Sequence, residues 1–223
     1  MGFFVRVLLF YRVWVAGVAG YLLGCILSAD IVTRMANARR HDAVDLRAVG
    51  SGNPGGANAV ANLGAGWGAA VVAGDIAKGA IAAQAGRLIA GDAGAYAAAT
   101  GAVAGHCLPA FANFRGGKGV ATSAGTTLIC FPIYVPVDLG IVGASYARLR
   151  HGAAATLTAT FVFCLAAVGW YRLRLPNAWG PRASIGLPLY ALATSSVIAW
   201  KFLNAPPHKG DIQAQPAHEA ASK

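Results

Sequence analysis

Charged residues are scarce in this sequence. Of its 223 residues, 12% are charged and 57% are hydrophobic, whereas charged residues make up about a quarter of a soluble globular domain. This shortage argues against a soluble protein and indicates a membrane protein. A soluble alanine-rich helical bundle is the alternative, but the apolar stretches show no charged face at helical spacing.

Paired cysteines are also missing. The four cysteines fall singly in apolar stretches without a CxxC pair, as buried structural residues do: Cys25, Cys107, Cys130 and Cys164. The sequence therefore predicts neither a metal site nor a cofactor site. A secretory signal is not expected either, because the first apolar stretch carries Arg6 and Arg12 and no small-residue cleavage site follows it.

A nucleotide-binding loop of the P-loop type is absent. That loop needs Gly five residues before a Gly-Lys pair and Ser or Thr after it. Here the residue five before Gly117 is Ala112, and Lys118 is followed by Gly119. The sequence feature that would most strongly indicate ATP binding is therefore missing.

What the sequence has instead is a series of long apolar stretches. Four are bounded by charged residues: 13–29, 93–114, 151–171 and 183–200. Each approaches or exceeds the ~20 residues that a membrane-spanning helix needs. Two more, 64–85 and 119–147, are interrupted, and the second is interpreted as two short or tilted helices. The prediction is an all-α integral membrane protein with about seven transmembrane helices, or about six as the alternative.

The stretches define one domain and set its orientation. Residues 1–204 are predicted to form a polytopic membrane domain, and the polar, proline-bearing residues 205–223 a disordered cytoplasmic tail.

The net charge of +10 is interpreted as a sign of membrane topology, since basic loops mark the cytoplasmic side, and no nucleic-acid partner is expected. Four arginines precede the first glycine-rich loop: Arg34, Arg39, Arg40 and Arg47. This loop is therefore predicted to be cytoplasmic and the N-terminus external. A second set of arginines lies in the loop after the stretch 151–171 and argues against seven crossings: Arg172, Arg174 and Arg182.

Two glycine-rich loops carry the functional signal. GSGNPGGAN, residues 50–58, leads into a helix predicted to begin near Asn62, and RGGKG, residues 115–119, also directly precedes a helix. Glycines allow a ligand to approach the backbone, and unpaired NH groups at a helix start attract phosphate. Two crossings separate the loops, so both should emerge on one face. A simple tight turn is the alternative for the first loop taken alone.

An acidic and a basic residue interrupt the stretch 64–85. Asp75 and Lys78 are three residues apart and therefore share one helix face. Because unpaired charges in a membrane helix are costly, we expect the two to pair or to line a polar pocket.

With these segments the sequence resembles a known family. GSGNPGGAN, DIAKG at 75–79 and GHCLPAFANFRGGKGVAT at 105–122 are similar to signature segments of bacterial membrane acyltransferases that move a fatty acyl group from acyl phosphate to glycerol 3-phosphate. The resemblance extends from Tyr21 onward. It implies a multi-pass protein of the bacterial cell membrane, with its active site at the cytoplasmic face and no cofactor. The product would be 1-acyl-glycerol 3-phosphate, a precursor in phospholipid synthesis.

The resemblance also implies roles for individual residues. Lys118 would neutralise phosphate, while Ser51 and Asn53 would donate hydrogen bonds, and these three are the predicted catalytic residues. The predicted substrate-binding residues are Gly50, Gly52, Gly55, Asn58, His106, Arg115, Gly116, Gly117, Gly119 and Asn204. Other bacterial acyltransferases at this step use a His with an Asp five residues on, and no His here has one.

Several positions depart from the family pattern. Ala57 stands where Thr is usual, Ala61 where Arg is usual, and Lys201 where His is expected. Asp211 and His151 are candidates to replace an acid and a serine. We predict an active enzyme in which other groups replace the missing ones. The alternative is a non-catalytic paralogue that binds a phosphorylated lipid or a partner; a transporter is less favoured, because the polar groups cluster in loops.

Overall fold

The protein is helical throughout residues 2–149 and 152–205, which the computed structural model describes, and these residues contain no strand. The α-helices are α1 (Phe3–Gly24), α2 (Ser28–Asn37), α3 (Gly56–Leu63), α4 (Ala65–Cys107), α5 (Val120–Cys130), α6 (Val135–Leu149), α7 (Gly152–Leu173) and α8 (Gly186–Leu203). Short 3-10 turns, η1 (Ala110–Ala112) and η2 (Pro132–Tyr134), lie on either side of α5. The predicted all-α fold is confirmed.

Helix α4 consists of two helices that fold back on each other. The backbone leaves the helical conformation at Ala90 and Gly91, and Gly91 has φ of 63°, a left-handed value that glycine adopts without strain. The halves correspond to the predicted stretches 64–85 and 93–114. The second half ends at Cys107, earlier than predicted, because the next residue is non-helical and precedes a proline.

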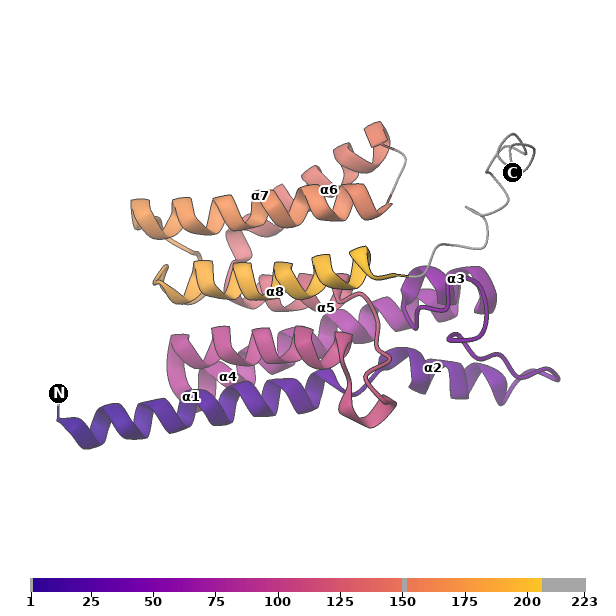
Figure 1. Cartoon of the computed structure of the whole chain (residues 1–223), viewed down its shortest axis with the longest axis horizontal. Helices are drawn as coiled ribbons and strands as arrows, with labels where there is room; N and C mark the ends of the chain where they lie inside the picture. Colours follow the sequence, from indigo (N-terminus) through magenta and orange to yellow (C-terminus); the bar gives the residue numbers. More distant parts are fainter. Residues whose placement is uncertain (1, 150–151, 206–223) are drawn as a thin grey trace, which may run out of the picture.

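The prediction that residues 119–147 form two short helices is confirmed. Helices α5 and α6 are separated by η2, which begins at Pro132. With α1, the halves of α4, α7 and α8, this gives seven helical segments along the length of the bundle in the described residues (Figure 1). Three helical segments of the described chain are long and apolar enough to cross a membrane: Phe4–Asn37, Gly152–Leu173 and Gly186–Leu203.

One predicted helix start was wrong, and the first helix begins before the apolar stretch 13–29 that was expected to span. Helix α1 begins at Phe3 rather than Val13 and includes the exposed Arg6 and Arg12, because long basic side chains reach water from a helix that continues past them. The helix after the first glycine-rich loop begins at Gly56 rather than near Asn62. It is a separate helix, α3, since the backbone is non-helical at Gly64 before α4 begins.

Small residues let α1 lie directly against the second half of α4. A methyl group added at Gly20 or Gly24 would overlap the backbone of Ala98 or Ala102, and one at Gly105 would overlap the carbonyl of Tyr21. Such backbone contact is typical of helix packing in lipid, where small residues rather than large apolar ones form the interface. A high content of alanine and glycine could also have indicated a soluble bundle. Here these small residues allow α1 and the second half of α4 to pack closely.

The connections gather at two ends of the bundle (Figure 1). At the loop end, defined by residues 38–55, 108–119 and 204–205, Arg47 Nε donates to the Arg115 carbonyl. At the N-terminal end, defined by residues 2–3, 88–92 and 174–185, the backbone N–H of Arg182 donates to Asp92. The two glycine-rich loops therefore emerge on the same face, as predicted.

The α1–α4 contact makes a prediction about stability. Gly20→Ala should lower the free energy of unfolding by about 1–3 kcal/mol, because its methyl group forces the helices apart. Gly143→Ala in α6 is the control, since a methyl group there meets nothing within 4 Å and should be neutral or stabilise by up to about 1 kcal/mol through helix propensity. Thermal unfolding of the purified variants in detergent measures both; equal effects would contradict the packing argument.

Candidate active site

A cavity of about 1230 Å³ opens at the loop end. Its walls come from the two glycine-rich loops, from α3, α4 and α5, and from the facing ends of α7 and α8. Most of the predicted site residues line it, including the three predicted to be catalytic, Ser51, Asn53 and Lys118. Segments that are more than 60 residues apart in sequence are thus brought to one place.

Asn58 holds the first glycine-rich loop in shape. Its side-chain oxygen accepts the N–H of Ser51 at 3.1 Å, and its amide nitrogen donates to the carbonyls of Leu46 at 2.8 Å and Val49 at 3.1 Å. A methyl group at Gly50 would overlap that side chain, so glycine is required there. Asn58 is 5% exposed. These contacts give it a structural function, and its predicted substrate contact stays a prediction.

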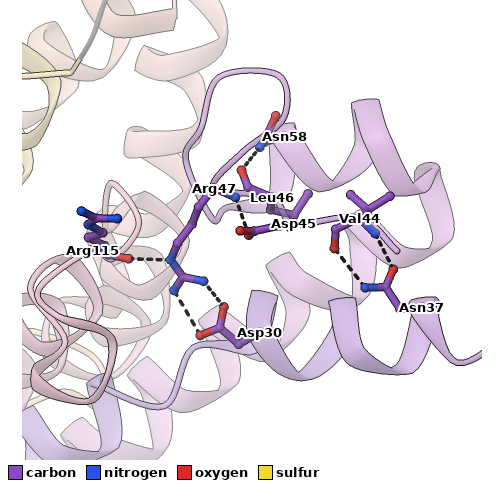
Figure 2. A network of polar contacts seen from close by, with 8 residues as sticks. All are labelled: Asp30, Asn37, Val44, Asp45, Leu46, Arg47, Asn58 and Arg115. Atoms are coloured by element: carbon purple, nitrogen blue, oxygen red, sulfur yellow. Dashed lines mark hydrogen bonds and ion pairs between the residues drawn. The ribbon is translucent and has the colours of Figure 1, made fainter. Parts of the chain in front are cut away.

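Arg47 joins the two loops and α2 (Figure 2). Its Nη1 and Nη2 atoms donate to the two carboxylate oxygens of Asp30 at 2.6 and 3.1 Å, and its Nε donates to the Arg115 carbonyl at 3.1 Å. Hydrogen bonding to Asp30 raises the pKa of Arg47 above its ordinary value. From the sequence, Arg47 was predicted only to be one of the basic residues that mark the cytoplasmic side. Its spacing from Asp30 and Arg115 does not indicate that it contacts either of them.

The second glycine-rich loop packs against His106. The N–H of Gly117 donates to the His106 carbonyl at 3.1 Å. A methyl group at Gly116 would overlap that carbonyl, and one at Gly117 would overlap the Nε2 atom of the imidazole. These two glycines therefore allow the loop to lie on the ring, which places Lys118 at the cavity.

Beneath the loop, the buried side chains of Asp75 and His106 form a polar cluster with Lys78, whose side chain is 11% exposed. The Lys78 ammonium lies 2.8 Å from Asp75 Oδ1, 2.9 Å from His106 Nδ1 and 2.9 Å from the Ile26 carbonyl. Asp75 is 2% exposed and His106 3%. The predicted Asp75–Lys78 pair is confirmed. His106 Nδ1 also lies 3.5 Å from Asp75 Oδ1, so this ring nitrogen contacts both charged members of the cluster.

Polar groups in the cavity are left without protein partners. Within the described residues, the Ser51 hydroxyl and the Asn53 side-chain amide make no hydrogen bond. Arg115 and Lys201 line the cavity and form no ion pair with any carboxylate of the described chain. Lys118 lies 4.4 Å above the Phe202 ring, and burial lowers its pKa below the ordinary value. Uncompensated cations of this kind suit phosphate groups.

The positions that depart from the family pattern also lie at this cavity. Ala57 and Ala61 line it, as does Lys201 from the last turn of α8. Asn204 lines it too, although its amide nitrogen donates to the Trp200 carbonyl at 2.9 Å. His151, Asp211 and the predicted tail from 206 onward lie outside the described residues.

The fold and cavity define a helical membrane protein with a cation-lined site at one end of its bundle. The profile of the family described as "Glycerol-3-phosphate acyltransferase" matches residues 14–208. The glycerol-3-phosphate acyltransferase of Azotobacter vinelandii is 35% identical over 210 residues, covering 91% of this chain and 95% of that protein. That of Thermoanaerobacter pseudethanolicus is 36% identical over 155 residues, covering 70% and 75%. The chain therefore belongs to the glycerol-3-phosphate acyltransferase family.

A solved structure shares this fold. The crystal structure of PlsY (YgiH), an integral membrane glycerol 3-phosphate acyltransferase in its glycerol 3-phosphate form, aligns with a TM-score of 0.69. The two are 25% identical, and the match covers 92% of this chain and 97% of PlsY. With its own apolar helices, this identifies the chain as a multi-pass integral membrane protein and removes the soluble bundle as an alternative.

The buried cluster makes a prediction about unfolding. Asp75→Ala should cost about 3–5 kcal/mol because it leaves the Lys78 cation buried without its counter-charge, and the double change Asp75→Ala/Lys78→Ala should cost less. The control is the half-exposed pair Arg87–Asp92, at 3.5 Å, whose coupling should stay below about 1 kcal/mol. A double-mutant cycle measured by thermal unfolding in detergent gives both values. Additive losses at Asp75 and Lys78 would rule out a stabilising pair.

Proposed function

We propose that this chain transfers a fatty acyl group from acyl phosphate to glycerol 3-phosphate at the loop-end cavity and releases 1-acyl-glycerol 3-phosphate. Membership of the family supports acyl transfer to glycerol 3-phosphate. The observation that carries the proposal is that both glycine-rich loops line one cavity, together with three basic residues that form no ion pair within the described residues: Arg115, Lys118 and Lys201. A reaction between two phosphorylated substrates needs this concentration of positive charge.

The chemistry needs little from the side chains beyond positioning and charge. Acyl phosphate is a mixed anhydride, so the primary hydroxyl of the acceptor attacks the acyl carbon and phosphate leaves. One carbon–oxygen bond to the acceptor forms, one carbon–oxygen bond to phosphate breaks, and a substrate phosphate oxygen takes the hydroxyl proton. Fixed cations stabilise the charge on the leaving phosphate, and a bound pair of substrates reacts without the entropic cost of encounter.

We assign roles to the polar side chains of the cavity that form no hydrogen bond or ion pair within the described protein. The Lys118 ammonium binds phosphate, because no described carboxylate pairs with it; the Ser51 hydroxyl and the Asn53 amide donate hydrogen bonds to substrate oxygens, because no described residue hydrogen-bonds to them. Lys201 supplies a cation at the cavity where Ala61 has none. The predicted glycines contribute close backbone approach, and His106 positions the second loop through its carbonyl.

The orientation in the membrane follows from charge. We infer that the loop end is cytoplasmic, because it carries Arg39, Arg40 and Arg47 and basic residues accumulate on that side. The N-terminus lies at the opposite end of the bundle (Figure 1). Seven crossings are consistent with this arrangement.

Cysteine labelling tests the orientation. In a background with the native cysteines replaced, Gly2→Cys should react with a membrane-impermeant maleimide on intact cells, whereas Arg40→Cys should react only after lysis. Both positions are exposed in the fold, so a difference in labelling between them cannot result from burial of one of the two cysteines. Labelling of Arg40→Cys on intact cells would place the cavity outside and overturn the assignment.

Lys118 makes the sharpest test of the activity. Lys118→Ala should lower kcat/KM by at least about 10²-fold, as losing a group that stabilises transition-state charge does. Lys118→Arg should also be strongly impaired, because guanidinium is larger and presents its donors differently. Acyl transfer from acyl phosphate to glycerol 3-phosphate is measured with purified protein, together with thermal unfolding to show that the variants fold.

The control for Lys118 is Arg40→Ala, an exposed cation of the loop end that does not line the cavity, and its activity should be normal. Near-normal transfer by a folded Lys118→Ala variant would refute the role of Lys118. If the unmodified protein bound both substrates and transferred nothing, the non-catalytic paralogue would be the correct reading.

A further inference from the structure

We propose a second binding site at the N-terminal end, which holds the phosphate of an anionic phospholipid. A cavity of about 840 Å³ opens there beneath the connection between α7 and α8. Three arginines line it: Arg172, Arg174 and Arg182. It lies at the opposite end of the bundle from the loop-end cavity (Figure 1) and shares no lining residue with it. The proposal is therefore independent of the acyl-transfer reaction.

The connection that forms this cavity is fixed in place. Asn177 is buried, and its amide nitrogen donates to the carbonyl of Cys130 at 2.9 Å and to that of Pro181 at 2.7 Å. The Trp170 indole donates to the Pro176 carbonyl at 3.0 Å. Because these hydrogen bonds tie the connection to itself, to the end of α5 and to α7, a ligand meets a cavity that is already formed, and less binding free energy is spent on ordering the connection.

The charge of the cavity is not balanced by the protein. Arg172, Arg174 and Arg182 are exposed, and no carboxylate of the described chain pairs with their guanidinium groups. Asp92 lies nearby, but it faces Arg87 at 3.5 Å and accepts the backbone N–H of Arg182. Guanidinium groups bind phosphate oxygens in a forked geometry, so three of them around one cavity suit a phosphate ligand.

The position of these arginines needs a reason beyond topology. With the loop end cytoplasmic, they lie on the side where basic residues are normally few. The same connection and the end of α7 also expose apolar side chains: Leu173 is 70% exposed, Trp179 63% and Ile185 56%. Tryptophan beside basic residues is typical of the membrane interface, and a phospholipid places its phosphate next to apolar chains. This juxtaposition favours a lipid headgroup over a soluble phosphate ion.

The experiment measures retained lipid on the purified protein. The intact protein is reconstituted in nanodiscs containing phosphatidylglycerol in phosphatidylcholine, and binding of each lipid is followed by native mass spectrometry. Arg174→Gln/Arg182→Gln should weaken phosphatidylglycerol binding by about 10- to 30-fold, since each interfacial arginine contributes about a three- to fivefold factor. Arg6→Gln/Arg12→Gln on α1 is the matched control, with the same charge loss outside the cavity, and it should retain the lipid.

Three results would overturn the proposal. Equal loss of phosphatidylglycerol in both double variants would indicate general surface charge, and no preference for phosphatidylglycerol over phosphatidylcholine in the unmodified protein would exclude a headgroup site. Binding of inorganic phosphate, added alone, with the same dependence on Arg174 and Arg182 and without phosphatidylglycerol binding would assign the cavity to a soluble anion. Acyl transfer by Arg174→Gln/Arg182→Gln, assayed in phosphatidylcholine alone, should stay normal and serves as the folding control.

Discussion

The candidate site depends on one ammonium group that is largely enclosed by the helices, with its side chain 11% exposed. Lys78 Nζ meets Asp75 of its own helix, His106 of the second half of α4 and the carbonyl of Ile26 between α1 and α2. A charge buried among apolar helices is stable only with such partners, so the chain must bring these three elements together wherever it buries Lys78. His106 in turn receives the N–H of Gly117 on its carbonyl. The floor of the cavity and the position of its second loop therefore follow from satisfying a single cation.

Above that floor, the polar groups that hold the loops are separate from those that are left without a protein partner. Asn58, Arg47 and His106 use their polar atoms to hold the loops, whereas the side chains of Ser51 and Asn53 face the cavity unpartnered among the described residues. Held loops keep the free groups in place without requiring them to bond to one another. Such preorganisation is the condition under which fixed dipoles and charges stabilise a transition state, because they need not reorient when charge develops.

Much of this architecture could be predicted from local patterns. Apolar stretches gave the helices, counting crossings put both glycine-rich loops on one face, and a spacing of three paired Asp75 with Lys78. Helix limits were less predictable. A helix can continue past a basic residue such as Arg12 or begin among the glycines before Asn62, so the residue type at these positions does not determine where the helix begins. The contacts of His106 with Lys78 and of Arg47 with Asp30 and Arg115 depend on tertiary packing between segments 17 to 68 residues apart, for which one sequence carries no periodic signal.

The altered motif positions gain their meaning from the cavity. Loss of an arginine at Ala61 would lower the positive charge available to phosphate, and taken alone would argue against catalysis. Ala61 and Lys201, however, line the same cavity although they belong to α3 and α8. Electrostatic stabilisation of a phosphate depends on where the charge lies and not on the element that supplies it. We propose that a cation from the end of α8 compensates for the one expected in α3; the ammonium of Lys201, 5.9 Å from the centre of the Trp200 ring, would then turn toward the cavity.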